Sequence, residues 1–134
     1  MIRVENLSFA FTEQQIFSQL CLSVQRGDFL TILGPNGCGK STLLRLLRGT
    51  LKPQSGGIIW NGIPLEKITA REMARTVAVV PQSTHVGFPY LVDELVAMGR
   101  YPHRRGLFEF MTRADRKAIR HALVMNSNRP LRCG

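Results

Sequence analysis

The stretch that decides the fold occupies residues 34–42 and reads Gly34-Pro35-Asn36-Gly37-Cys38-Gly39-Lys40-Ser41-Thr42. It matches the pattern G-x-x-x-x-G-K-[ST], in which a glycine-rich loop binds the phosphates of a nucleotide. An apolar run at 29–33 predicts a buried strand before the loop, and leucines at helical spacing predict a helix over 41–48. Because a true phosphate loop joins a strand to a helix, we predict an α/β fold of the P-loop NTPase class.

Each residue type in the loop has a part in holding phosphate. Glycines let the backbone curl so that successive N–H groups point at one anion. The N-terminus of the following helix adds free N–H groups and its positive dipole end. We expect Lys40 to reach the β- and γ-phosphates, Ser41 to bind Mg²⁺, and Thr42 to hydrogen-bond the α-phosphate. The predicted nucleotide-binding residues of the loop are Gly34, Asn36, Gly37, Cys38, Gly39, Lys40, Ser41 and Thr42.

Hydrophobic patterning and turn residues predict the other elements. Positions 2–11 alternate imperfectly, which is typical of an edge strand, and Thr112 with Asp115 forms a capping-box pattern before a helix. The further predicted strands lie at 20–24, 58–60 and 77–80. The turn Asn61-Gly62 should close the strand at 58–60, and Gly49 should end the helix over 41–48. The further predicted helices lie at 69–75, 92–99 and 113–125.

Length and composition indicate one globular domain. The chain has 134 residues, of which 44% are hydrophobic. No apolar run is long enough to span a bilayer, and the N-terminus lacks the basic start and apolar block of a signal peptide. The three cysteines are odd in number without a CxxC spacing, so we expect free thiols in a reducing compartment and no metal site. These features predict a cytoplasmic protein.

The positive charge is concentrated at one end. Of a net charge of +9, residues 1–99 contribute +2, with nine Lys/Arg against seven Asp/Glu. Residues 100–134 contribute +7, with nine Lys/Arg against two Asp/Glu. Such an end suggests nucleic acid, an anionic membrane surface or a solvated face. Because no aromatic residues are interleaved as a base-stacking platform, nucleic acid is the unfavoured alternative and a solvated face the favoured one.

Three blocks in order resemble the ABC-transporter ATPases. They are LGPNGCGKSTLLRLLRG at 33–49, LKPQSGGIIWNG at 51–62 and VAVVPQ at 77–82. The order and spacing match from Met1 to about Ala122. A fourth block, VAMGRYPHRRGLF at 96–108, resembles the subgroup that serves importers of iron-siderophore, haem and cobalamin type.

This resemblance implies an architecture and a function. It implies the N-terminal part of the ATPase fold, with a core that includes an antiparallel β subdomain at 1–85, the start of the helical subdomain at 86–125, and an aberrant or disordered tail at 126–134. It further implies the ATP-binding subunit of an importer that couples ATP binding and hydrolysis to transport. The implied partners are permease subunits and a second ATPase subunit across the ATP sites, at the cytoplasmic face of the bacterial inner membrane.

The resemblance also assigns two residues outside the loop. Phe11 matches the aromatic residue that stacks on adenine, although a place in the strand core is the equal alternative. Gln82 matches the family's Q-loop glutamine, which helps to hold Mg²⁺ and the attacking water and is therefore the expected catalytic residue. Ser55-Gly56-Gly57 is not the LSGGQ signature and is expected to be a turn. The histidines at 85, 103 and 121 do not match the family's switch histidine.

Several family motifs do not occur in the 134 residues: LSGGQ, a strand ending in Asp-Glu, and the switch histidine. We therefore expect a truncated chain, from a frameshift or gene fragment, that binds MgATP but does not hydrolyse it alone. The predicted strand at 29–33 would lack its usual neighbours, which puts folding in doubt. Two alternatives stay open: a non-catalytic ATP-binding remnant, and a soluble P-loop protein that acts on nucleic acid.

Overall fold

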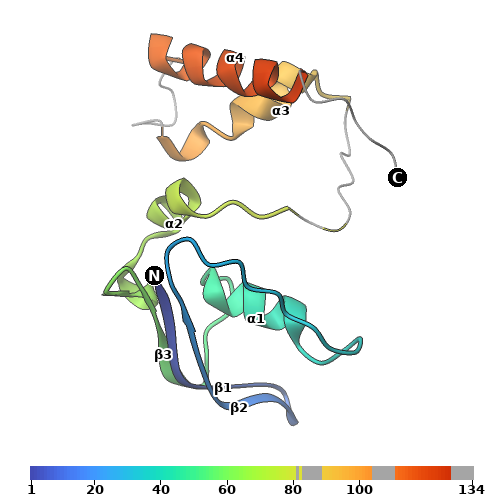
Figure 1. Cartoon of the computed structure of the whole chain (residues 1–134), viewed down its shortest axis with the longest axis vertical. Coiled ribbons are helices and arrows are strands. Elements are labelled where there is room, and N and C mark those ends of the chain that lie inside the picture. Colours follow the sequence, from blue (N-terminus) through green and yellow to red (C-terminus); the bar gives the residue numbers. More distant parts are fainter. Residues whose placement is uncertain (81, 83–88, 104–110, 128–134) are drawn as a thin grey trace. The chain divides into compact units, whose positions relative to one another are not determined.

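The computed structural model of the chain describes residues 1–80, 82, 89–103 and 111–127. They fall into two compact units, Met1–Val77 and Ala78–Gly134. The first unit contains a sheet and two helices, and the second contains two helices (Figure 1). Most of the tail predicted at 126–134 lies outside the described residues.

The first unit is built on an antiparallel sheet with the strand order β2-β1-β3-β4. β1 (Ile2–Phe11) pairs with β2 (Gln14–Val24) on one side and with β3 (Ser55–Trp60) on the other. β4 (Ile63–Pro64) returns along β3 after the predicted Asn61-Gly62 turn. β1 therefore lies inside the sheet, and the expectation that it is an edge strand is wrong.

Bulges explain the broken alternation of β1. Its register shifts against β2 between Val4 and Leu7, and against β3 between Glu5 and Ser8. Asn6 lies inside both shifts and has a φ of 47°. A bulge inserts an extra residue into one strand of a pair, so the apolar residues on its two sides can still face one core. The broken alternation of apolar residues in β1 is therefore explained by bulges in a central strand.

α1 (Lys40–Leu47) supplies the other half of the core and lies against the sheet in Figure 1. The Trp60 indole N–H donates to the Leu47 carbonyl over 2.8 Å, which satisfies one of the free carbonyls at the helix end. Gly49, at φ 75°, ends the helix with an N–H bond to the Leu46 carbonyl, as predicted. The buried residues of this core are Val4, Leu7, Phe9, Leu43, Leu46, Leu47 and Ile58.

The helix predicted at 69–75 is α2 (Ala70–Thr76), which follows a short 3₁₀ turn, η1 (Leu65–Lys67). Thr69 begins it with a capping box. The Glu72 N–H donates to Thr69 Oγ1 over 3.2 Å, and the Thr69 N–H donates to the Glu72 carboxylate over 2.8 Å. Met73 is the buried residue of this helix.

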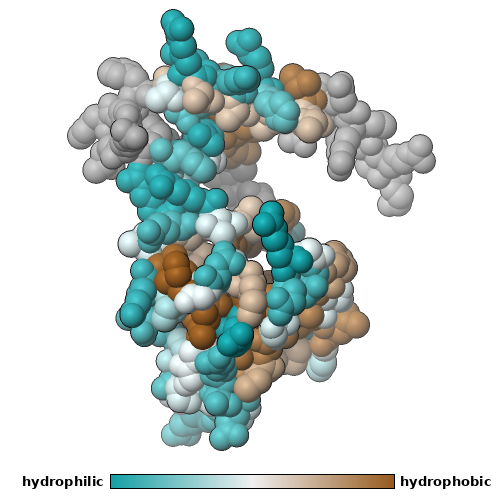
Figure 2. All heavy atoms as spheres, turned by 60° about the vertical axis from the view of Figure 1, so that its left-hand side comes forward, coloured by the Kyte–Doolittle hydropathy of each residue, from teal (hydrophilic) through white to brown (hydrophobic). Residues whose placement is uncertain are grey.

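Two predicted strands do not form. Residues 29–33 and 77–80 have no strand pairing, and most of their large side chains are exposed: 95% for Phe29, 86% for Leu33 and 94% for Val80. Ile32 is partly buried against the core. A buried strand needs hydrogen-bonded neighbours and a covering layer, and the described residues supply neither. Figure 2 shows hydrophobic (brown) surface on the first unit. Ser55-Gly56-Gly57 also differs from the prediction, because it begins β3 and is not a turn.

The second unit contains α3 (Val92–Met98), the 3₁₀ turn η2 (Tyr101–His103) and α4 (Arg113–Ser127). α3 and α4 confirm the helices predicted at 92–99 and 113–125. α4 continues two residues past its expected end, into the segment predicted as tail. At the start of α3, the Leu91 N–H donates to Glu94 Oε2 over 3.0 Å. The Leu91 side chain has no oxygen that could accept a hydrogen bond from the Glu94 N–H in return.

The capping box at the start of α4 forms as predicted. The Asp115 N–H donates to Thr112 Oγ1 over 3.2 Å, and the Thr112 N–H donates to Asp115 Oδ2 over 3.1 Å. Arg100 adds an ion pair that the sequence did not indicate, with Nε 2.9 Å from Asp115 Oδ1. Asp115 is 5% exposed, so these contacts tie α4 to the end of α3 at a buried carboxylate.

Acid should weaken this junction in a defined range. Hydrogen bonds from Thr112 and the ion pair with Arg100 lower the pKa of Asp115 from 3.8 to about 2. Because the folded pKa is lowered, the stabilisation is complete above pH 3.8 and is lost as the pH falls toward 2. We expect Asp115→Asn to remove an acid-induced loss of helical circular dichroism in this range. Glu13→Gln, at an exposed turn, should leave that loss unchanged, and an unaltered acid transition in Asp115→Asn would contradict the assignment.

Candidate nucleotide-binding site

The predicted phosphate loop connects the exposed segment 29–33 to the first turn of α1. Gly37 and Gly39 have φ values of 85° and 97°, a left-handed conformation that residues with a side chain resist. Gly39 is the N-cap of α1, and no side chain caps the helix there. The first N–H groups of α1 therefore have neither a helical partner nor a capping oxygen, which suits them to an anion.

The start of α1 rests on β2. A Cβ on Gly39 would lie 2.6 Å from Ile16 Cγ2 and 2.9 Å from Phe17 Cζ. Glycine is thus required at this position for close packing as well as for its backbone conformation. Nothing in the spacing of the sequence showed that Ile16 and Phe17 support the loop. The glycine at position 39 indicates a close approach of other atoms, but it does not identify Ile16 and Phe17 as the residues approached.

Lys40 is the cation of the loop. Its Nζ donates to the carbonyl oxygens of Gly34 and Pro35, at 2.7 Å each, and lies 3.7 Å from Cys38 Sγ. The ammonium group thus crosses the turn of the loop and joins its two ends. An ammonium donor can exchange carbonyl oxygens for phosphate oxygens, which form stronger charge-assisted bonds.

The remaining loop residues present small polar groups. Ser41 is exposed and Thr42 half-buried in the first turn of α1, and Asn36 and Cys38 are exposed. No group of three or more His, Cys, Asp or Glu side chains within the described part of the chain could hold a metal ion. The Ser41 hydroxyl is a hard oxygen donor of the kind that Mg²⁺ prefers beside phosphate oxygens, so the residues present fit MgATP.

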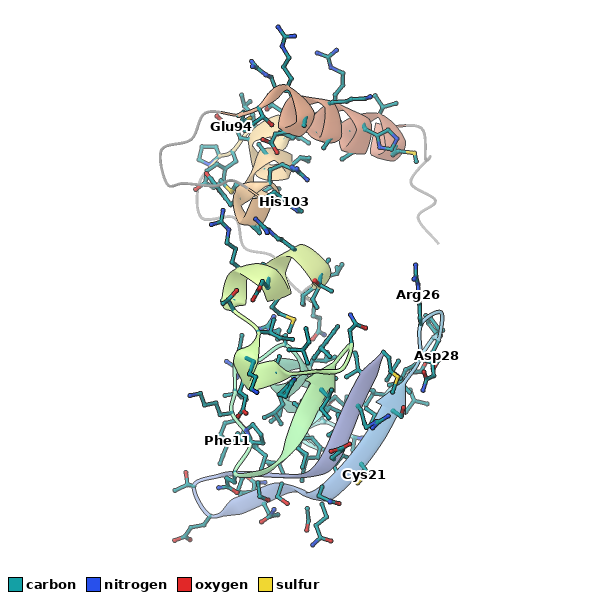
Figure 3. The ribbon with its side chains drawn as sticks, turned by 90° about the vertical axis from the view of Figure 1, so that its left-hand side faces the viewer. Phe11, Cys21, Arg26, Asp28, Glu94 and His103 are labelled. Atoms are coloured by element: carbon teal, nitrogen blue, oxygen red, sulfur yellow. The ribbon has the colours of Figure 1, made fainter. Side chains whose placement is uncertain are left out.

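Phe11 lies at the end of β1, in the same unit as the loop, and is 43% exposed (Figure 3). Its ring meets that of Phe9 edge to face, with centroids 4.8 Å apart. Phe9 is paired in register with Phe17, whose ring borders Gly39. A row of aromatic residues therefore leads from the N-terminus of α1 to a partly exposed ring, and the adenine-stacking role predicted for Phe11 stays a prediction.

Gln82 is exposed and belongs to the second unit, whereas the loop belongs to the first. Its predicted role toward Mg²⁺ and water stays a prediction. His103 and His121 are exposed, in η2 and α4, and His85 lies outside the described residues.

Comparisons with known proteins agree with this arrangement. The profile of the family described as ABC transporter matches residues 17–131. A hemin import ATP-binding protein of Escherichia coli O157:H7 is 42% identical over 106 residues, which cover 79% of this chain and 41% of that protein. An iron(3+)-hydroxamate import ATP-binding protein of Bacillus subtilis (strain 168) is 33% identical over 122 residues, covering 91% and 45%.

One solved structure, described as an inward-facing conformation of a metal-chelate type ABC transporter, has the same fold over most of this chain. Its TM-score is 0.70 at 32% sequence identity, and the match covers 94% of this chain and 44% of that one. The chain thus spans less than half the length of each of these relatives.

Proposed function

The chain belongs to the ABC transporter family, and we propose that it forms the ATP-binding part of an importer subunit. The observation that supports this proposal most directly is the loop at 34–42, with Lys40 bridging its carbonyls and an uncapped helix behind it. MgATP would place its phosphates against the backbone of Gly34, Asn36, Gly37, Cys38 and Gly39. Lys40 would bind the β- and γ-phosphates, Thr42 the α-phosphate and Ser41 the magnesium ion.

Two further residues complete the proposed site. Phe11 would stack on adenine through its partly exposed ring, which offers a π surface without a polar group. Gln82 would help to hold Mg²⁺ and the attacking water. Both roles come from the family resemblance and are proposals for this chain.

The class of importer is proposed from two relatives, a hemin import ATP-binding protein and an iron(3+)-hydroxamate import ATP-binding protein. We propose iron-siderophore or a related metal chelate as the transported compound. The proposed partners are the permease subunits and a second ATP-binding subunit, at the cytoplasmic face of a bacterial inner membrane. Within the described part of the chain, no helix has the length and apolar character that a bilayer crossing requires.

A second candidate function is ATP binding without catalysis. It is the function expected of the 134 residues taken by themselves, which contain no LSGGQ, no strand ending in Asp-Glu and no switch histidine. Hydrolysis needs a carboxylate base beside the attacking water. We therefore expect the 134 residues to bind MgATP with no Mg²⁺-dependent turnover of their own.

Calorimetric titration with MgATP and an assay of released phosphate test these two functions together. Binding without turnover is the expected result, and binding that fails altogether would overturn the proposed site. A turnover that disappears in Lys40→Ala would show that the chain is catalytic by itself. Co-purification of the chain with permease subunits would support the importer assignment.

Labelling of cysteines offers an independent check of where the nucleotide binds. Cys38 lies in the loop and Cys21 lies in β2, and both are exposed free thiols. MgATP at about 100 times its dissociation constant leaves about 1% of sites free, so alkylation of Cys38 should slow by up to about 100-fold. Cys21 is the built-in control, and its labelling rate should not change. Equal labelling of Cys38 with and without MgATP would place the nucleotide elsewhere.

A further inference from the structure

One face of α4 is basic over its first eight residues, 113–120. Arg113, Arg116, Lys117 and Arg120 are spaced by three and four residues, so they lie on one side of the helix, and all four are exposed. We call these four residues the α4 basic face. Nitrogen-tipped side chains project from α4 in Figure 3, on the side away from α3, and the hydrophilic (teal) side chains of the same region are visible in Figure 2.

The opposite side of α4 is fixed by packing. Asp115 and Ile119 are 5% and 9% exposed, and the ion pair from Asp115 to Arg100 holds this side toward the end of α3. The helix therefore cannot turn the α4 basic face inward without breaking a buried ion pair and exposing an apolar side chain. The outward direction of the four cations is a property of the fold.

No carboxylate that the structure describes neutralises the charges of this face. Within the described residues of the chain, no carboxylate forms an ion pair with any of the four cations, and Asp115 is already used by Arg100. The whole segment 100–134 has nine Lys/Arg against two Asp/Glu, a net charge of +7. A single-sign field of this kind attracts an extended anionic surface.

An apolar residue continues the same face. Val124 follows Arg120 by four residues and Lys117 by seven, so it lies in line with the cations, and its side chain is 54% exposed. Met125 beside it is 63% exposed. Cations followed by an exposed apolar end suit the interface of a bilayer, where arginine and lysine bind phosphate and the apolar group enters the acyl boundary. α4 contains no Phe, Tyr or Trp side chain on which bases could stack.

We propose that the α4 basic face binds the phosphate headgroups of anionic phospholipids at a membrane surface. The complementary charges supply the attraction, and Val124 and Met125 select a bilayer over other polyanions. This contact needs no nucleotide, because none of its residues belongs to the phosphate loop. It therefore goes beyond the proposed function and can fail or hold independently of it.

The test is co-sedimentation of the full chain with vesicles of phosphatidylglycerol mixed with phosphatidylcholine, and with vesicles of phosphatidylcholine alone. The test variant combines Arg116→Gln, Lys117→Gln and Arg120→Gln, since glutamine keeps helix propensity. The matched control combines Arg26→Gln, Lys52→Gln and Lys67→Gln, which removes the same charge from exposed positions of the first unit. Circular dichroism checks that both variants keep their helices.

Partitioning onto the anionic vesicles should fall by about 100-fold in the α4 variant and by less than about fivefold in the control, with no binding to neutral vesicles. Val124→Ser should lower partitioning by about three- to tenfold and leave any binding to duplex DNA unchanged. An equal fall in the control would show that only net charge matters and would overturn the proposal. Equal binding to neutral vesicles, or tighter binding to duplex DNA than to anionic vesicles, would overturn it as well.

Discussion

Replacing Lys40 by alanine should weaken MgATP binding by about ten- to a hundred-fold. A charge-assisted hydrogen bond is worth about 1.5–3 kcal/mol, which corresponds to this range of affinity. The structure adds a second reason, because Lys40 Nζ also donates to the carbonyls of Gly34 and Pro35 at 2.7 Å each. The variant would lose the cation that meets the phosphates and the bridge that joins the two ends of the loop.

Titration of the variant with MgATP measures this loss, and Lys52→Ala is the matched control. Lys52 is an exposed lysine of the same unit that lies outside the loop, so its removal should leave the affinity within about twofold. Unchanged affinity in Lys40→Ala would show that the phosphates are bound elsewhere. A similar loss in both variants would indicate a general charge effect.

Gly56→Ala should lower the free energy of unfolding by about 3 kcal/mol, from the sum of a left-handed backbone and an overpacked contact. Gly56 has a φ of 77° in β3, opposite the bulge of β1. A Cβ at this position would collide with the backbone carbonyl oxygens of Glu5 and Asn6. Because these atoms belong to the main chain of a central strand, they cannot move aside as a flexible side chain can.

The neighbouring glycine provides the control. A Cβ on Gly57 would have no atom within 4 Å, and Gly57 is not among the residues with positive φ. Gly57→Ala should therefore change stability by less than about 1 kcal/mol in either direction. Urea unfolding followed by the fluorescence of Trp60, the single tryptophan of the chain, measures both variants. Equal stability of the two variants would mean that the bulge relaxes around the added methyl group.

The local features of this fold could be predicted from the sequence because their causes are local. The phosphate loop, the glycine that ends α1, the Asn61-Gly62 turn and the capping box at Thr112 each depend on residues a few positions apart. The glycines of the loop have the left-handed conformations that the pattern requires. The family resemblance then supplied what the loop alone did not, the class of NTPase, and the comparisons confirm it.

The features that failed depend on distant neighbours. The apolar residues at 29–33 and 77–80 have the pattern of buried strands. A strand forms only where another strand pairs with it, and no described residue pairs with either segment. The edge position expected for β1 failed for a related reason, because bulges disturb alternation as an edge does. Likewise, a glycine at position 39 predicts a tight approach but not that Ile16 and Phe17 are the surface approached.

The contact of Gly39 with Ile16 and Phe17 couples the stability of the β1–β2 hairpin to nucleotide binding at the phosphate loop. Suppose that a nucleotide binds only when the N-terminus of α1 packs against β2. The bound nucleotide would then stabilise this packing by the same free energy by which the packing strengthens nucleotide binding. The packing of β1 and β2 thus regulates the nucleotide affinity of the phosphate loop. Substitutions that weaken the packing of Phe9, Phe11 and Phe17 should therefore change the nucleotide affinity, although none of these rings needs to contact a phosphate.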